Sequence, residues 1–89
     1  MASAIKKVPF TVTASTTEDI IVPETSSNVA MRVSWTGGTP SLTFKQVEGG
    51  TDFPLEVPAE NGTIYDLMGA YSVTFGATGS DVEYAISFS

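Results

Sequence analysis

The chain has 89 residues and a net charge of −6, with four lysine and arginine residues against ten acidic ones, and it contains neither cysteine nor histidine. Its length predicts one domain, because domains usually have about 100–150 residues. The acidic balance argues against nucleic-acid binding, which needs clustered basic side chains. Composition excludes disulfide staples and the usual Cys and His zinc sites. No stretch approaches the roughly 20 apolar residues of a membrane-spanning helix, so we expect a soluble protein that does not bind membranes.

The charge is distributed unevenly along the chain. Lys6 and Lys7 precede a body in which Arg32 and Lys45 are the only basic residues among all ten acids. The sequence therefore predicts an N-terminal arm at residues 1–8 and a folded domain at residues 9–89. A domain this small buries only roughly 60–65% of the surface of its unfolded chain, so association with other subunits would supply extra burial. No secretory signal is recognisable at the start.

Apolar residues recur at every second position, which is the period of β-strands and not of helices. The first predicted strand begins near Val8, where Pro9 indicates an edge or a strand start. The two clearest strands have large apolar residues on one face and small or polar residues on the other. Their apolar positions are Val29, Met31, Val33 and Trp35 in one, and Val82, Tyr84, Ile86 and Phe88 in the other.

Glycine, proline and polar clusters separate the predicted strands. Gly37-Gly38-Thr39-Pro40 predicts a chain reversal after Trp35, and residues 76–81 predict another between two later strands. Pro54 and Pro58 place the extended segment 53–57 at an edge. About seven strands with turn signals every 8–12 residues indicate an all-β fold, a single small antiparallel β-sandwich.

Trp35 and the run Gly69-Ala70-Tyr71-Ser72-Val73 carry a local resemblance to immunoglobulin-like sandwiches. In that family a core tryptophan packs between the sheets, and a Gly-x-Tyr-x-Cys run marks the tyrosine corner. Val73 stands in the place of the cysteine here. The resemblance implies an immunoglobulin-like strand order, with a jelly-roll-like order as the alternative, and it implies architecture only.

The side chains available for catalysis are few. Without histidine and cysteine, the commonest general base and the thiolate nucleophile are missing. Neighbouring carboxylates are the remaining candidates, and adjacent strand residues point to opposite faces of a sheet. We therefore predict that the protein is not an enzyme and binds no cofactor or metal. The candidate carboxylate pairs are Glu18 with Asp19, Glu56 with Glu60, and Asp81 with Glu83.

In length, composition and all-β pattern the chain resembles the small decoration or cement proteins of phage capsids. That resemblance implies a structural virion protein, assembled in the host cytoplasm, that bridges neighbouring capsid subunits. Its partner would be the major capsid protein or another virion protein, and it would form a homo-oligomer, with a trimer expected. The arm would make the cross-subunit contact through Ile5, Lys6, Lys7, Val8 and Phe10. A second surface would be formed by Phe53, Leu55 and Val57.

The alternative from another class is a ligand-binding or adhesive sandwich module that binds carbohydrate or a protein surface. Its loops would carry the site. Tyr65 is expected to face away from the core if its neighbour Ile64 faces inward. The loop residues assigned to this alternative are Gly37, Gly38, Tyr65 and Asp81.

Overall fold

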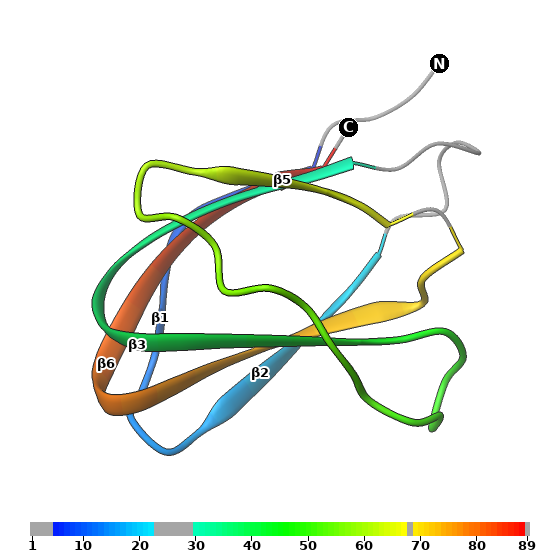
Figure 1. Ribbon diagram of the computed structural model, residues 1–89, viewed down its shortest axis with the longest axis horizontal. Helices are drawn as coiled ribbons and strands as arrows, with labels where there is room; N and C mark the ends of the chain where they lie inside the picture. Colours follow the sequence, from blue (N-terminus) through cyan, green and yellow to red (C-terminus); the bar gives the residue numbers. More distant parts are fainter. Residues whose placement is uncertain (1–4, 23–29, 68, 89) are drawn as a thin grey trace.

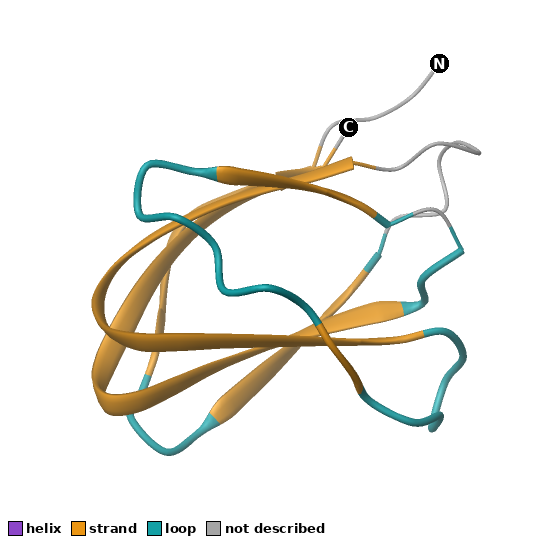
Figure 2. Ribbon diagram, in the orientation of Figure 1, coloured by secondary structure: helices purple, strands orange, loops and turns teal. Residues whose placement is uncertain are grey.

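The computed structural model describes residues 5–22, 30–67 and 69–88. These ranges contain strands, turns and loops and no helix (Figure 2). The strands pair in one antiparallel sheet that is folded into a small β-sandwich, which confirms the predicted fold class. The six strands are β1 (Ile5–Val12), β2 (Thr17–Ile21), β3 (Ala30–Lys45), β4 (Phe53–Pro54), β5 (Thr63–Asp66) and β6 (Ser72–Phe88).

The two longest strands build both layers of the sandwich. β3 and β6 pair along almost their whole length, from Met31 opposite Phe88 to Lys45 opposite Ser72. Both strands bend sharply near their middle, so the ribbon folds back over itself (Figure 1). The first layer has the order β5, β3 (30–37), β6 (82–88), β1, and the second has the order β4, β3 (39–45), β6 (72–78), β2.

The predicted chain reversals at 37–40 and 76–81 are wrong, because both segments lie inside continuous strands. At the bend the register shifts between Gly37 and Thr39. Gly37 has a φ of 113°, and a Cβ atom there would collide with the carbonyl of Asp81. A Cβ atom at Gly38 would collide with the carbonyl of Ser80. The glycines therefore allow two strands to bend together, instead of turning one strand back on itself.

This bend also explains why six strands are found where about seven were expected. The segments on either side of each glycine-rich stretch are two halves of one strand. Pro40 is tolerated within β3 because β4 and β5 pair only with the ends of this strand. The side of β3 away from β6 therefore has edge character at Pro40, where no ladder donor is needed.

The core lies between the two layers and follows the predicted alternation. Three aromatic rings connect the layers: Phe10 stacks on Tyr84 with centroids 5.4 Å apart, and Phe75 meets Tyr84 edge-on at 5.0 Å. The Tyr84 hydroxyl donates to the Gly76 carbonyl of the opposite layer, so the buried phenol is satisfied. Trp35 and Phe44 are half-buried at the margin of the core. Side chains at most 2% exposed are Val12, Met31, Val33, Val73, Phe75, Val82, Tyr84, Ile86 and Phe88.

The predicted arm at residues 1–8 overlaps the first strand. Residues 1–4 lie outside the described ranges, whereas Ile5, Lys6 and Lys7 pair through their backbones with Phe88, Ser87 and Ile86. A register shift between Lys7 and Phe10 accompanies Pro9. The expectation that the proline-containing strand lies at an edge is confirmed, because β1 is the last strand of its layer.

Candidate interaction surfaces

The first candidate surface is the edge of the second layer at β4, which we name the Phe53 edge (residues 53–57). Phe53 is 41% exposed and Val57 is 58% exposed, whereas Leu55 between them packs against the core. The Phe53 ring lies 5.4 Å from the Phe44 ring directly opposite it on β3. Only Phe53 and Pro54 belong to a strand, so most of this segment is extended chain beyond the ladder.

A pocket of about 200 Å³ opens beside the Phe53 edge. Its apolar lining comes from Phe44 and Leu55 in the second layer and Leu67 at the end of β5, and its polar lining includes Gln46 and Asp66. The turn before β4 is fixed by an ion pair in which Lys45 Nζ lies 2.6 Å from Asp52 Oδ1. The hydrogen bond to Asp52 raises the pKa of Lys45. The edge is therefore apolar and is held at its start by a local charge pair.

The segment between β4 and β5 closes one flank of the sandwich. It crosses from the second layer to the first (Figure 1), and its carbonyl groups accept hydrogen bonds from two aromatic side chains. Trp35 Nε1 donates to the Pro58 carbonyl at 2.6 Å, and the Tyr65 hydroxyl donates to the Glu56 carbonyl. We name this side the closed flank (β4, residues 55–62 and β5).

Tyr65 faces the core, and Ile64 faces solvent. The sequence predicted that Tyr65 would face outward if Ile64 faced inward, and the structure has the opposite arrangement. Tyr65 is 9% exposed and Ile64 is 61% exposed. The register explains this, because Tyr65 lies opposite the fully buried Met31 on β3. Burial raises the pKa of Tyr65, and the nearby Glu56 charge raises it further. Burial also raises the pKa of Tyr84.

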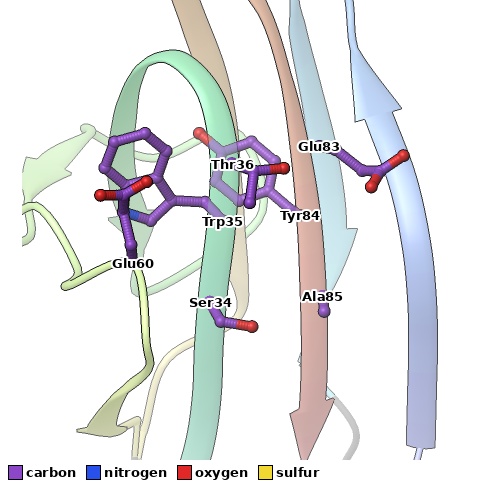
Figure 3. Close-up of a pocket in the computed structure, with 7 residues that line it drawn as sticks. All are labelled: Ser34, Trp35, Thr36, Glu60, Glu83, Tyr84 and Ala85. Atoms are coloured by element: carbon purple, nitrogen blue, oxygen red, sulfur yellow. The ribbon is translucent and has the colours of Figure 1, made fainter.

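A second pocket, of about 110 Å³, lies beside Trp35 on the first layer. Figure 3 shows the Glu60 carboxylate next to the indole of Trp35, while the Glu83 side chain points away toward the neighbouring strand. Ser34 and Thr36 add hydroxyl groups to the lining. The two carboxylates do not converge on one point, so this pocket offers an aromatic surface with one adjacent acid, and no acid–base pair.

The opposite side of the sandwich, which we name the open flank, is formed by β1 and β2. Both strands pair with β6 on the side that β3 does not occupy. Val22 N donates to the Tyr71 carbonyl at 2.9 Å, so these two residues form a hydrogen-bonded pair. Such pairs alternate along an antiparallel ladder, so the amides of Ile20 and Glu18 face β6. The amides of Ile21, Asp19 and Thr17 therefore point outward from β2.

The remaining sequence-predicted residues fall in different places. Gly37 and Gly38 shape the bend inside β3. Asp81 lies in β6, and its Oδ1 accepts a hydrogen bond from Ala14 N at 2.9 Å in the turn between β1 and β2. These residues do not form a loop cluster with Tyr65. The sequence did not single out Trp35 or Glu60 as surface residues, because Trp35 lies on the apolar register of its strand.

Two further properties concern the described residues as a group. No set of three or more acidic side chains among them is arranged to hold a metal ion. None of the described segments is a helix of the length and apolar character that crossing a membrane requires.

Comparison with known proteins gives a likeness in fold. No family model matches the sequence, and no curated protein matches it. One solved structure that is similar comes from Bacillus endospore appendages, described as a novel family of disulfide-linked pili. The match has a TM-score of 0.51 and 17% sequence identity, and it covers 99% of this chain and 88% of that chain. At this identity the likeness shows the fold alone.

Proposed function

We propose that this protein is a structural subunit that decorates or cements a phage capsid by bridging neighbouring capsid subunits. The observation that carries the proposal is the Phe53 edge, where exposed apolar side chains lie beside a pocket of about 200 Å³. Among the residues whose burial the structure describes, five large apolar ones are exposed, and three of these, Val47, Phe53 and Val57, lie within 11 residues of chain. Exposed apolar groups concentrated in this way mark a protein contact.

The similarity to an appendage subunit supports a structural role in a general sense. That protein belongs to a family described as disulfide-linked pili. This chain has no cysteine, so disulfides cannot link it to other subunits. Apolar burial and strand-edge hydrogen bonds are the two kinds of contact that its surface offers.

The mechanism is mechanical and not catalytic. A subunit that contacts two capsid proteins at once adds its binding free energy to the free energy needed to separate them. A standard interface buries about 800 Å² on each partner. The whole chain exposes 5227 Å², so one such contact leaves most of the surface free for a second.

The test has two steps: to find whether a major capsid gene lies beside this gene, and to measure binding to capsids built from its product. We expect the protein to co-sediment with those capsids, and the double variant Phe53→Ser, Val57→Ser to lose attachment by at least tenfold. Ile64→Ser is the control, because Ile64 is at least as exposed as Phe53 and Val57 but lies on the other layer. Attachment of the double variant at the level of the control, or absence of a capsid gene nearby, would overturn the proposal.

The alternative, a ligand-binding or adhesive module, has one observation in its favour. The pocket beside Trp35 offers an aromatic face and the Glu60 carboxylate, and sugars are often held by stacking on an aromatic ring next to an acidic acceptor. A glycan array with wild-type protein and Glu60→Gln tests it. Binding that the substitution weakens would support the module, and an array without hits would remove its carbohydrate form.

A further inference from the structure

The pocket beside Trp35 offers acceptors of hydrogen bonds more than donors. Its polar lining includes the Glu60 carboxylate, which only accepts, and the hydroxyls of Ser34 and Thr36, which both accept and donate. Trp35 and Tyr84 also line the pocket, but the indole N–H and the phenol hydroxyl already donate to backbone carbonyls. The side chains of this site therefore favour a ligand that brings its own hydrogen-bond donors.

The charge around this pocket is negative. Glu60 and Glu83 both line it, and Figure 3 shows the Glu60 carboxylate next to the indole while the Glu83 side chain points toward the neighbouring strand. Arg32 is the basic residue nearest to Trp35 along β3, and it is exposed and is not one of the described lining residues. The whole chain carries a net charge of −6. A cation is therefore attracted to this site, and an anion is repelled.

An aromatic ring beside a carboxylate is a combination that holds organic cations. The ring quadrupole attracts a cation placed over its face, and tryptophan does so more strongly than tyrosine or phenylalanine. A guanidinium group is planar, stacks on aromatic rings and carries its N–H donors in a fixed fork that fits carboxylate oxygens. An ammonium group has neither the flat shape nor the fork. Trp35 and Glu60 together therefore match a guanidinium group better than an ammonium group or a neutral ligand.

The size of the pocket also suits a guanidinium group. The pocket has a volume of about 110 Å³, whereas an enclosed apolar cavity of about 150 Å³ holds a benzene molecule. A guanidinium group is smaller than benzene, and the ring of a sugar with its hydroxyls is larger. The pocket therefore has room for the end of an arginine side chain, but only for one edge of a sugar.

The indole and the backbone that carries Glu60 are held in place within the protein itself. Trp35 Nε1 is fixed by its hydrogen bond to the Pro58 carbonyl. Glu60 lies in a turn that the Gly62 N–H closes by donating to the Ala59 carbonyl at 3.0 Å. Binding therefore costs the ordering of the exposed Glu60 side chain and little else on this side of the contact.

The pocket lies close to the Phe53 edge, and both belong to the closed flank. Val57 ends that edge and is 58% exposed. Glu60 follows it by three residues (60 − 57 = 3), which is at most about 11 Å of chain. A standard interface of about 800 Å² on each partner is wide enough to cover both. One partner surface therefore contacts the apolar edge and the pocket at the same time.

We infer that the pocket beside Trp35 binds an arginine side chain of the partner protein, with its guanidinium group stacked on the indole and paired with the Glu60 carboxylate. The inference deepens the proposed function and rests on it, because it names the group that the capsid subunit presents next to its apolar contact with the Phe53 edge. Arginine and aromatic residues are the side chains that most often dominate the binding free energy of protein interfaces.

Titration of the isolated protein with short peptides tests the pocket without any capsid. The chain has a single tryptophan, so the fluorescence and the indole N–H resonance of Trp35 report on this site. The probes are acetylated and amidated glycine peptides with one central arginine, lysine or citrulline, which is the neutral analogue of arginine. The arginine peptide should bind about fivefold more tightly than the citrulline peptide. The lysine peptide should fall between them, and methyl glucoside should leave both Trp35 signals unchanged.

Two charge-matched variants test the role of Glu60. Glu60→Gln keeps the shape of the side chain and removes its charge, so it should weaken binding of the arginine peptide about threefold. Glu83→Gln removes the same charge from a lining residue whose side chain points away, so it should weaken binding by less than about twofold.

Three results would overturn the inference: equal effects of the two substitutions, equal affinities of the arginine and citrulline peptides, or no saturable binding of the arginine peptide. A response of Trp35 to methyl glucoside and not to the arginine peptide would overturn it in favour of the adhesive module.

The inference and the proposed function fail separately in these experiments. Capsids that bind the wild-type protein and the Glu60→Gln variant equally well would overturn the arginine contact and leave the capsid role intact. An arginine peptide that binds through Glu60, in a protein that attaches to no capsid, would support the pocket assignment and overturn the capsid role.

Discussion

The closed and open flanks belong to the same sandwich and treat their strand edges differently. On the closed flank the segment between β4 and β5 crosses between the layers, and two aromatic side chains hold it through Trp35 Nε1 and the Tyr65 hydroxyl. On the open flank the outward amides of β2 have no partner strand among the described residues. The closed flank therefore has a long connection with two polar anchors between the layers, and no described segment forms such a connection on the open flank.

The edges of the open flank differ between themselves as well. β1 contains Pro9, a register shift and two lysines, which are devices that discourage uncontrolled strand addition. β2 has neither proline nor a register shift, and Ile21 on it is 54% exposed. β2 therefore has fewer of these devices than β1, although Glu18 and Asp19 place charges on it.

The largest effect is expected from loss of an anchor on the closed flank. Tyr65→Ala should lower the free energy of unfolding by about 3–5 kcal/mol, because it removes a buried aromatic side chain and leaves a cavity. Urea denaturation measures this change. Ile64→Ala, one residue away and exposed, should change it by less than about 0.5 kcal/mol. Equal effects of the two substitutions would mean that the closed flank is not sealed by Tyr65.

Proline substitutions on β2 should give an intermediate effect that depends on the position. Ile20→Pro removes an amide that bonds to β6 and should cost about 2 kcal/mol or more in unfolding free energy. Ile21→Pro removes an outward amide and should cost less than about 1 kcal/mol. Similar melting curves for both variants would contradict the assigned alternation of the ladder.

The smallest effect concerns alkaline pH. Tyr65 and Tyr84 have raised pKa values in the folded protein, mainly through burial, so folding favours their neutral forms. That stabilisation is fully present below the ordinary tyrosine pKa of about 10 and is lost as pH rises through the folded pKa. The urea midpoint should therefore fall above about pH 10, and the fall should be smaller in Tyr65→Phe. An identical pH profile for the variant would exclude a contribution from the closed flank.

Alternation along the chain was enough to predict the fold class and most of the core. Met31, Val33, Phe75, Tyr84 and Ile86 are buried as their spacing indicates, because a strand with one buried face leaves little freedom of register. The bend was not predictable from local signals. Two adjacent glycines are as compatible with a chain reversal as with a bend inside a strand. The pairing of β3 with β6 on both sides of Gly38 shows that this segment is a bend.

The surfaces were harder to predict than the core. Pro54 and Pro58 correctly placed the Phe53 segment at an edge, since proline cannot donate to a ladder. Tyr65 was misjudged because Ile64 and Tyr65 are both apolar enough to face inward, and the choice depends on the register with Met31. The charges of β1 and β2 were visible in the sequence, but their placement on one flank depends on β6, about 60 residues further along the chain.

β6 has a consequence for the order in which the protein can acquire its structure. β1, β2 and β3 all precede it in the chain, and each takes β6 as its main or sole strand partner. During synthesis these strands emerge from the ribosome before the strand that joins them exists. Stable tertiary structure must then wait for residues 72–88, and the nascent chain before that point offers unsatisfied strands to chaperones and to its neighbours.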